Sequence, residues 1–173
     1  MSAQEHPLGI SFEFFPPNTD AGREKLMRNR DLLAERNPRF FSVTYGAGGS
    51  TQNRTITTVN AVRECGITTA PHLSCVGSEK AQLRELLTDY KAQGINSLVA
   101  LRGDLPSGMG GIGELRYANE LVEFIREETG DHFEIAVAAY PESHPQAASF
   151  EADLQNFARK MNAGANMAIT QYF

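Results

Sequence analysis

The stretch EKAQLRELLTDYKAQGINSLVALRG, residues 79–103, contains one full repeat of the pattern that decides the fold. Four of its apolar residues recur at helical spacing: Leu83, Leu86, Leu87 and Tyr90. This spacing predicts a helix with one apolar face. The run that follows, residues 95–103, is mostly apolar and is typical of a buried strand. Gly94 separates the two, and glycine permits the left-handed conformation in which helices commonly end.

The same helix-then-strand pattern extends outward in both directions. Strand-like runs occupy residues 8–15, 39–46, 67–75, 95–103, 133–140 and 166–173. They begin roughly 30 residues apart, which is the length of a strand with its crossover helix. Glycines close three more of the predicted helices just before a strand: Gly66, Gly130 and Gly164. The first helix is expected to end at Asn37-Pro38, and Ser78 and Ser149 are predicted N-caps.

Strands that alternate with helices predict parallel pairing with the helices packed outside. Two architectures satisfy this pattern, an open doubly wound sheet and a closed (β/α)8 barrel of about 250 residues. In the barrel, about six of the eight units fit into 173 residues. The expectation is then a single incomplete barrel domain over residues 1–173, a fragment of a longer protein with a bare sheet edge.

Composition narrows the classes of partner. The formal net charge is −5 and no run of Lys and Arg stands out, so nucleic acid is not expected as a partner. No apolar run approaches the ~20 residues of a membrane helix, and the first residues do not read as a signal peptide. Two cysteines, Cys65 and Cys75, make no disulfide framework, which fits a reducing cytoplasm.

Polar residues that could take part in catalysis or ligand binding follow or end most of the predicted strands. They are Thr44, Tyr45, His72, Arg102, Asp104, Tyr140, Glu142, His144 and Gln171. Taken singly, a buried histidine or glutamine is more often a satisfied core residue. In both competing folds, however, the active site lies at the carboxyl ends of the strands. Recurrence over several strands therefore predicts one convergent site.

Glu13 belongs to this group and stands inside the apolar run SFEFFPP, residues 11–17. One interpretation is a strand residue that faces solvent at the rim of a barrel. Phe12 and Phe14 flank it, however, and we expect them to restrict its access to water. A poorly hydrated carboxyl group has a raised pKa, which suits a general acid near neutral pH. Asp104, beside Arg102, is expected to stay ionised.

Other patterns point less clearly to chemistry. Residues 108–113 formally match G-x-G-x-x-G, but residues 104–107 separate them from the strand, which argues against a Rossmann-type nicotinamide dehydrogenase. The spacing of His72, Glu142 and His144 matches no standard metal-ligand set, so no metal is expected. A polar stripe on the last helix is either a solvated face or a flank for anionic oxygens: Asp153, Asn156, Arg159 and Lys160.

Seven motifs in order carry a resemblance to a known family. They are SFEFFPP, SVTYGAGGS, APHLSC, VALRGDLP, AAYPESHP, DLQNFARKMNAGAN and AITQYF. Together they resemble methylenetetrahydrofolate reductase of the bacterial single-domain type, from about Ile10 to Phe173. The resemblance implies the (β/α)8 barrel rather than the open sheet, with FAD as cofactor and NADH or NADPH as electron donor. It implies reduction of 5,10-methylenetetrahydrofolate to 5-methyltetrahydrofolate by ping-pong turnover.

The resemblance also implies roles for individual residues. Glu13 matches the catalytic acid, Asp104 an aspartate near the flavin and the folate, and Gln171 a glutamine that contacts folate and nicotinamide in turn. All three are then substrate-binding as well. The FAD-binding positions implied are Thr44, Tyr45, Ala47, His72, Arg102, Gly103, Asp104, Ala118, Tyr140, His144, Ala147, Asp153, Asn156, Arg159, Lys160 and Ile169.

Members of the resembled family continue past AITQYF through two further strand–helix units, so the chain reads as C-terminally truncated. An alternative to an enzyme is therefore a non-catalytic flavin- or folate-binding module. The resemblance suggests a homo-oligomer, and the sequence does not distinguish NADH from NADPH.

Overall fold

The computed structural model describes residues 9–45, 49–103 and 113–173, with backbone only for residues 49–53. The strands are β1 (Ser11–Phe14), β2 (Phe40–Val43), β3 (Thr69–Ser74), β4 (Ser97–Leu101), β5 (Glu134–Ala139) and β6 (Met167–Thr170). The helices are α1 (Asp20–Ala34), α2 (Gly49–Arg63), α3 (Lys80–Ala92), α4 (Ala118–Thr129) and α5 (Phe150–Asn162). Every predicted strand is confirmed, and each is shorter than its apolar run because the run's ends enter loops.

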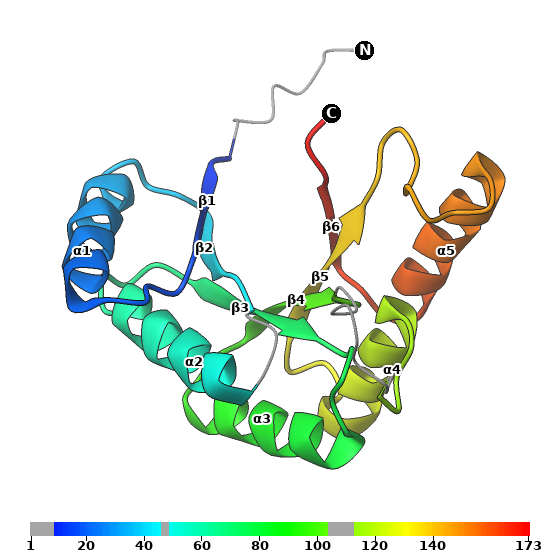
Figure 1. Cartoon of the computed structure of the whole chain (residues 1–173), viewed down its shortest axis with the longest axis horizontal. Helices are drawn as coiled ribbons and strands as arrows, with labels where there is room; N and C mark the ends of the chain where they lie inside the picture. The colour runs from blue at the N-terminus through cyan, green and yellow to red at the C-terminus, as the bar shows by residue number, and fades with distance from the viewer. Residues whose placement is uncertain (1–8, 46–48, 104–112) are drawn as a thin grey trace.

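The strands form one sheet in the order β1-β2-β3-β4-β5-β6, and every neighbouring pair is parallel. The sheet curves into an arc, and all of the described helices lie on its outer side (Figure 1). A doubly wound sheet reverses its strand order partway and carries helices on both faces. The open-sheet alternative, and the Rossmann reading with it, is therefore wrong for this chain. The structure is a parallel half-barrel of six strands.

Side chains at the helix starts explain where two helices begin. The hydroxyl of Thr19 accepts a hydrogen bond from the backbone at the start of α1, and Ser149 does the same for α5. The prediction for Ser78 is wrong, because Glu79 is the N-cap of α3 and forms a capping box with Gln82. Ser78 is instead buried, and its hydroxyl donates weakly to a carbonyl in the preceding strand.

Four helices end just before the predicted glycines. The four glycines take positive φ angles at these ends: Gly66 (84°), Gly94 (70°), Gly130 (58°) and Gly164 (112°). Asn37 adopts φ 51° between the end of α1 and β2, a conformation that asparagine tolerates better than most residues. Each of these turns reverses the chain toward the next parallel strand.

The apolar core lies on the convex side of the sheet, between the strands and the helices. Alternate residues of β1 to β5 enter it, as the period of two requires. Phe41, Leu73 and Val137 are each fully buried there, against the apolar faces of the helices. The largest fully buried side chains in the described residues are Tyr90, Phe41, Phe133, Leu73, Leu83, Leu87, Ile95, Leu98, Leu121, Ile125, Ile135 and Val43.

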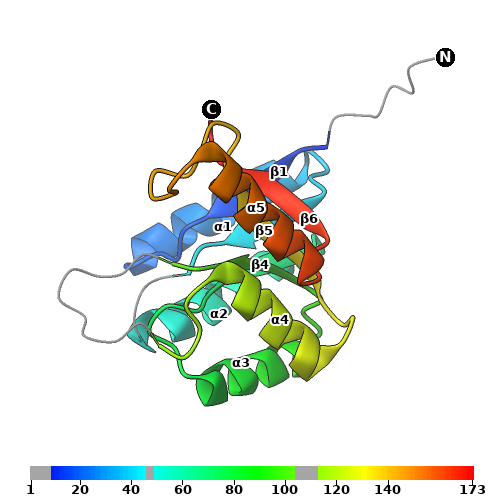
Figure 2. The same ribbon diagram turned by 90° about the vertical axis from the view of Figure 1, so that its right-hand side faces the viewer.

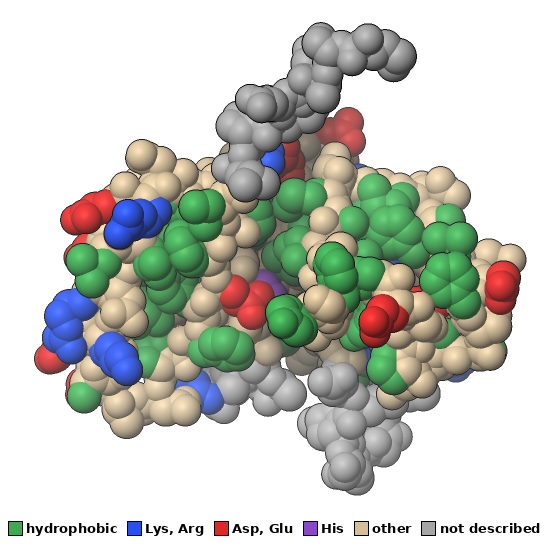
Figure 3. All heavy atoms as spheres, turned by 90° about the horizontal axis from the view of Figure 1, so that it is seen from above, with side chains coloured by type: hydrophobic (Ala, Val, Ile, Leu, Met, Phe, Trp, Pro, Cys, Tyr) green, Lys and Arg blue, Asp and Glu red, His purple; other side chains and the backbone are tan. Residues whose placement is uncertain are grey.

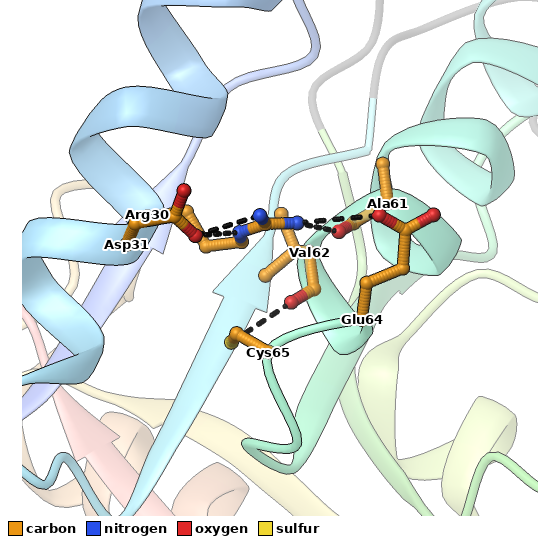
Figure 4. Close-up of polar contacts among 6 residues, drawn as sticks. All are labelled: Arg30, Asp31, Ala61, Val62, Glu64 and Cys65. Atoms are coloured by element: carbon orange, nitrogen blue, oxygen red, sulfur yellow. Dashed lines mark hydrogen bonds and ion pairs between the residues drawn. The ribbon is translucent and has the colours of Figure 1, made fainter.

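A polar clamp joins α1 to α2 on the outside of this core (Figure 4). Arg30 pairs with Asp31 of its own helix and donates to the carbonyl oxygen of Ala61 on α2. Glu64 lies 3.5 Å away from the same guanidinium group. The Cys65 thiol donates to a carbonyl one turn earlier in the chain. A guanidinium group with several partners can stay largely buried between helices, because its donors remain satisfied.

The last helix and strand, α5 and β6, are packed more loosely than the other elements. Helices α4 and α5 lie side by side outside β4 to β6 (Figure 2). None of the residues of α5 is buried, and Phe150 and Leu154 are more than half exposed. All four residues of β6 are exposed. Among the described residues, no helix combines the length and the apolar character that crossing a membrane requires.

Candidate active site at the strand ends

The concave face of the sheet carries the side chains that alternate with the core. Glu13 is level with Ser42 on β2, and Ser42 is level with Ala70 on β3. His72 lies two residues beyond Ala70 and therefore points to the same face. Figure 3 looks at this side of the molecule and shows acidic and histidine side chains together in the hollow, among apolar ones.

The environment of Glu13 differs from the sequence-based expectation. The rings of Phe12 and Phe14 pack toward Phe41, with centroids 6.2 and 5.1 Å from it, on the convex side. The side chain of Glu13 is 48% exposed on the other face. The expectation that the two phenylalanines restrict its hydration is wrong in this structure, because adjacent strand residues project to opposite faces.

His72 is the nearest titratable neighbour of Glu13. Its Nε2 lies 3.2 Å from the Glu13 Oε2, and the imidazole is 8% exposed. Burial lowers the pKa of His72, while the negative charge of Glu13 acts in the opposite direction. Burial has the larger effect, so the imidazole is neutral at neutral pH.

The turn after β4 is held in a fixed conformation. The Ser74 hydroxyl donates to the carbonyl oxygen of Arg102 at 2.8 Å, and the Arg102 guanidinium donates to Gln146 at 2.8 Å. Gly103 has φ +85°, and a Cβ there would lie 2.0 Å from the Ser74 Oγ. Only glycine fits this turn without a shift. It leads directly to Asp104, which lies outside the described residues, as does Ala47.

The loop after β5 is tied to the start of α5. The rings of Tyr140 and His144 meet edge to face, with centroids 4.5 Å apart. The backbone N–H of His144 donates to Asp153 at 2.8 Å, and the Nδ1 of His144 accepts from the backbone of Gln146 at 3.0 Å. Ala147 closes the turn by donating its N–H to the carbonyl oxygen of His144. Asp153 therefore positions this loop.

The rest of the polar stripe on α5 divides between two places. The Lys160 ammonium donates to the carbonyl oxygen of Ala138 on β5, and partial burial lowers its pKa. Arg159 donates to Asn156 at 2.8 Å and lines a groove between α4 and α5 together with Arg126. The structure thus brings Asp153 and Lys160 toward the ends of the strands and places Arg159 farther out.

The remaining predicted positions also occupy strand ends or the concave face. Thr44 follows β2, where its carbonyl oxygen accepts from the Thr55 hydroxyl at 3.2 Å, and half-buried Tyr45 comes next. Ile169 is level with Ala138, on the same face as Glu13. Two more occupy loop or helix starts: Ala118 begins α4, and Gln171 follows β6, with an exposed side chain and its N–H bonded to the carbonyl oxygen of Ala139.

Sequence reasoning missed two residues beside this set. Ser42 shares the face of Glu13, and Gln146 holds the Arg102 guanidinium. The alternation within β2 could have indicated Ser42, but only the folded loop brings Gln146 to β4. In the part of the chain that the structure describes, no three His, Cys, Asp or Glu side chains are placed to hold a metal ion.

Six consecutive parallel strands, outer helices and polar strand ends define a protein of the (β/α)-barrel class. The family model described as methylenetetrahydrofolate reductase matches residues 1–173. The chain belongs to the methylenetetrahydrofolate reductase family.

Individual relatives agree with the family model. The chain is 48% identical to the 5,10-methylenetetrahydrofolate reductase of Pectobacterium carotovorum and 45% identical to that of Escherichia coli K12. Each alignment covers 96% of this chain and 55% of the relative, so the chain spans little more than half the length of these proteins.

Solved structures support the fold alone, because their sequences are distant. An uncharacterized protein from Clostridium thermocellum that binds 5-methyl-5,6,7,8-tetrahydrofolic acid matches with TM-score 0.61 and 18% identity, over 95% of this chain and 55% of that one. Pyruvate carboxylase from Rhizobium etli matches with TM-score 0.62 and 12% identity, over 93% of this chain and 16% of that one.

Proposed function

We propose that this chain takes part in the FAD-dependent reduction of 5,10-methylenetetrahydrofolate to 5-methyltetrahydrofolate, with NADH or NADPH as electron donor. Membership of the family and the names of the bacterial relatives support the reaction. Plant relatives whose names specify NADH, from rice and maize, support a nicotinamide donor. The structural observation on which the proposal depends is Glu13, half exposed at the end of β1 and facing the hollow of the half-barrel.

The described residues fit a flavin. The Nε2 of His72 is buried on the concave face and makes no hydrogen bond among the described residues, although the Glu13 Oε2 lies 3.2 Å away. The turn of Arg102 and Gly103 offers a guanidinium group and backbone close together, and the ring of Tyr140 is half exposed at the next strand end. We propose that FAD contacts the positions that the family resemblance implies, with Asp153 and Lys160 shaping the loop side of the site.

When bound, FAD supplies the redox chemistry, which is the transfer of a hydride from the nicotinamide to the folate. The residues of the chain supply protons, charge and orientation. Glu13 is proposed to protonate the five-membered ring of the folate, which promotes its opening to an iminium. Asp104 is proposed to favour that cation by its negative charge. Gln171 is proposed to bind the folate and the nicotinamide in turn.

Substitution of the acid tests the proposal. In the Glu13→Gln variant we expect FAD binding and the reduction of FAD by the nicotinamide to be retained. We expect the folate half-reaction to slow by about 10²- to 10⁴-fold, the usual contribution of a general acid. The two half-reactions are followed separately by flavin absorbance in a stopped-flow instrument. Glu24→Gln, at an exposed position on α1, is the matched control.

Three outcomes of this experiment differ in meaning. Equal loss of both half-reactions in Glu13→Gln would remove the general-acid role. A wild-type chain that binds FAD but does not reduce the folate would favour the alternative, a non-catalytic flavin- or folate-binding module. A wild-type chain that does not bind FAD would count against both functions.

We also propose that residues 1–173 form a single domain, because one sheet and one main apolar cluster run through the described residues. A homo-oligomer and a cytoplasmic location stay predictions.

A further inference from the structure

The Nε2 of His72 is a buried polar atom without a hydrogen bond, and in the described residues it is the sole buried side-chain nitrogen or oxygen in that condition. The other described histidines differ from it. The Nε2 of His132 lies 3.0 Å from the carbonyl oxygen of Ile95, and the Nδ1 of His144 accepts from Gln146. Buried polar groups nearly always find a partner, so an unpartnered one points to a function.

The carboxyl group of Glu13 lies beside this nitrogen, with Oε2 at 3.2 Å. The two side chains come from β3 and β1 and reach across β2 on the concave face. The two atoms lie within hydrogen-bonding distance, but the orientation of the imidazole and the carboxyl group does not give a hydrogen bond. Because the side chain of Glu13 is half exposed, its carboxyl group is free to rotate toward the ring, whereas the buried imidazole is not.

The charge state of the pair follows from its surroundings. Burial lowers the pKa of His72 and the charge of Glu13 raises it, with burial dominant. The neighbours of His72 on the same face, Ser42 and Ala70 along with Val99 on β4, carry no titratable group. A neutral imidazole nitrogen accepts a hydrogen bond from a protonated carboxyl group or donates one to a carboxylate, according to which ring nitrogen carries the proton.

We propose that His72 is a positioning residue for Glu13, and that its buried Nε2 forms a hydrogen bond with the carboxyl group and holds it in one orientation on the concave face. The inference rests on the proposed function, in which Glu13 donates a proton. A carboxyl group on an open face otherwise samples several orientations, and a fixed one favours proton transfer to a bound folate. The role differs from contact with the flavin, because it acts through Glu13.

A titration that needs no turnover tests the coupling. The imidazole carbons of His72 are followed by NMR from pH 4 to 8 in the wild-type chain, in Glu13→Gln and in the control Glu24→Gln. We expect Glu13→Gln to lower the pKa of His72, because the carboxylate charge that raises it has been removed. Glu24→Gln leaves it unchanged. A pKa of His72 that is the same in all three proteins would overturn the inference.

Kinetics separate positioning from a structural role. We expect His72→Leu to slow the folate half-reaction by roughly 10- to 100-fold and to alter its pH profile. Because His72 is also one of the proposed FAD contacts, the two half-reactions are compared at saturating FAD, where the nicotinamide half-reaction is expected to lose less than the folate half-reaction. His72→Gln, which keeps a hydrogen-bonding group, restores part of the rate. Loss of FAD binding with an unaltered pH profile in His72→Leu would show a cofactor contact in place of positioning.

The two experiments also separate this inference from the proposed function. If the wild-type chain does not reduce the folate, the proposed function fails, and the NMR titration alone decides whether His72 and Glu13 are coupled. If the wild-type chain is active and the pKa of His72 is the same in Glu13→Gln as in the wild-type chain, the proposed function is retained and the positioning role is refuted.

Discussion

The two faces of the half-barrel differ although the same short strands make both. On the convex face, Phe41 and Val43 are fully buried beneath the helices. On the concave face of the same strand, Phe40 is only partly buried, while Ser42 shares its face with Glu13. The convex face therefore holds most of the buried apolar area, and the concave face holds the polar groups. Alternation along a strand lets one segment serve stability and chemistry at once.

The concave face has little apolar packing of its own. Its buried apolar cluster consists of small residues, Ala70, Val99 and Ala136, with Leu101 packed beside them. A hollow lined mainly by the amino-terminal ends of the strands crosses the face from β1 to β6, and neither Glu13 nor His72 lines it. Mutations on this face are expected to change binding and rates more than folding, whereas those on the convex face are expected to change stability first.

Adjacent phenylalanines on β2 give the sharpest test of this difference. We expect Phe41→Ala to lower the free energy of unfolding by about 3–5 kcal/mol, because a fully buried ring leaves a cavity. Phe40→Ala, on the open face, should cost clearly less. Urea denaturation followed by circular dichroism measures both. Equal losses would show that the concave face contributes as much to stability as the convex one.

The helix layer on the convex side is itself uneven, and a pair of leucines tests this. Leu87 of α3 is 1% exposed, and Leu154 of α5 is 57% exposed. Leu87→Ala should cost about 2–5 kcal/mol in the free energy of unfolding. Leu154→Ala should stay within about 0.5 kcal/mol of wild type. A large loss for Leu154→Ala would mean that α5 is covered in solution by something that buries it.

The two cysteines report how tightly the convex side is closed. Cys75 is fully buried, and burial raises the pKa of its thiol from 9.0 to about 11. Cys65, at the end of α2, is only partly buried. Iodoacetamide at pH 8 should therefore modify Cys65 well before Cys75, because the thiolate is the reactive form. Mass spectrometry of peptides measures the order.

The same shift has a pH consequence for stability. The pKa of Cys75 is higher in the folded than in the unfolded chain, so the unfolded chain loses this proton first. The contribution of the Cys75 thiol to the free energy of unfolding is fully present below about pH 9 and is lost as the pH rises toward 11.

In the iodoacetamide experiment, labelling of Cys75 as fast as Cys65 at pH 8 would contradict the closure of the convex side.

Much of the fold could be predicted because its signals are local. The apolar runs located all six strands, and glycines marked four helix ends with the positive φ that they adopt. Ser78 shows the limit of such signals. It precedes a helix and can cap one, but in the structure it is buried and Glu79 caps α3 instead.

The sequence predicted a set of site residues, and the structure shows what surrounds those of them that it describes. As predicted, His72 lies in the second half of β3, and Arg102 and Tyr140 directly follow β4 and β5. The hydration of Glu13 was wrongly predicted, because Phe12 and Phe14 alternate with it along β1 and pack on the convex face, which leaves the carboxyl group half exposed on the other face. Asp104 and Ala47 lie outside the described residues, so their roles stay predictions.

The sequence by itself determined the number and the direction of the strands, the alternation of apolar and polar residues, and the family motifs. These are set by local spacing and by residue type. Only the tertiary structure decided that the strands follow one another around an arc and that Glu13 and His72 meet across β2. The physical reason is that pairing order and curvature depend on contacts between distant segments, which a local pattern does not specify.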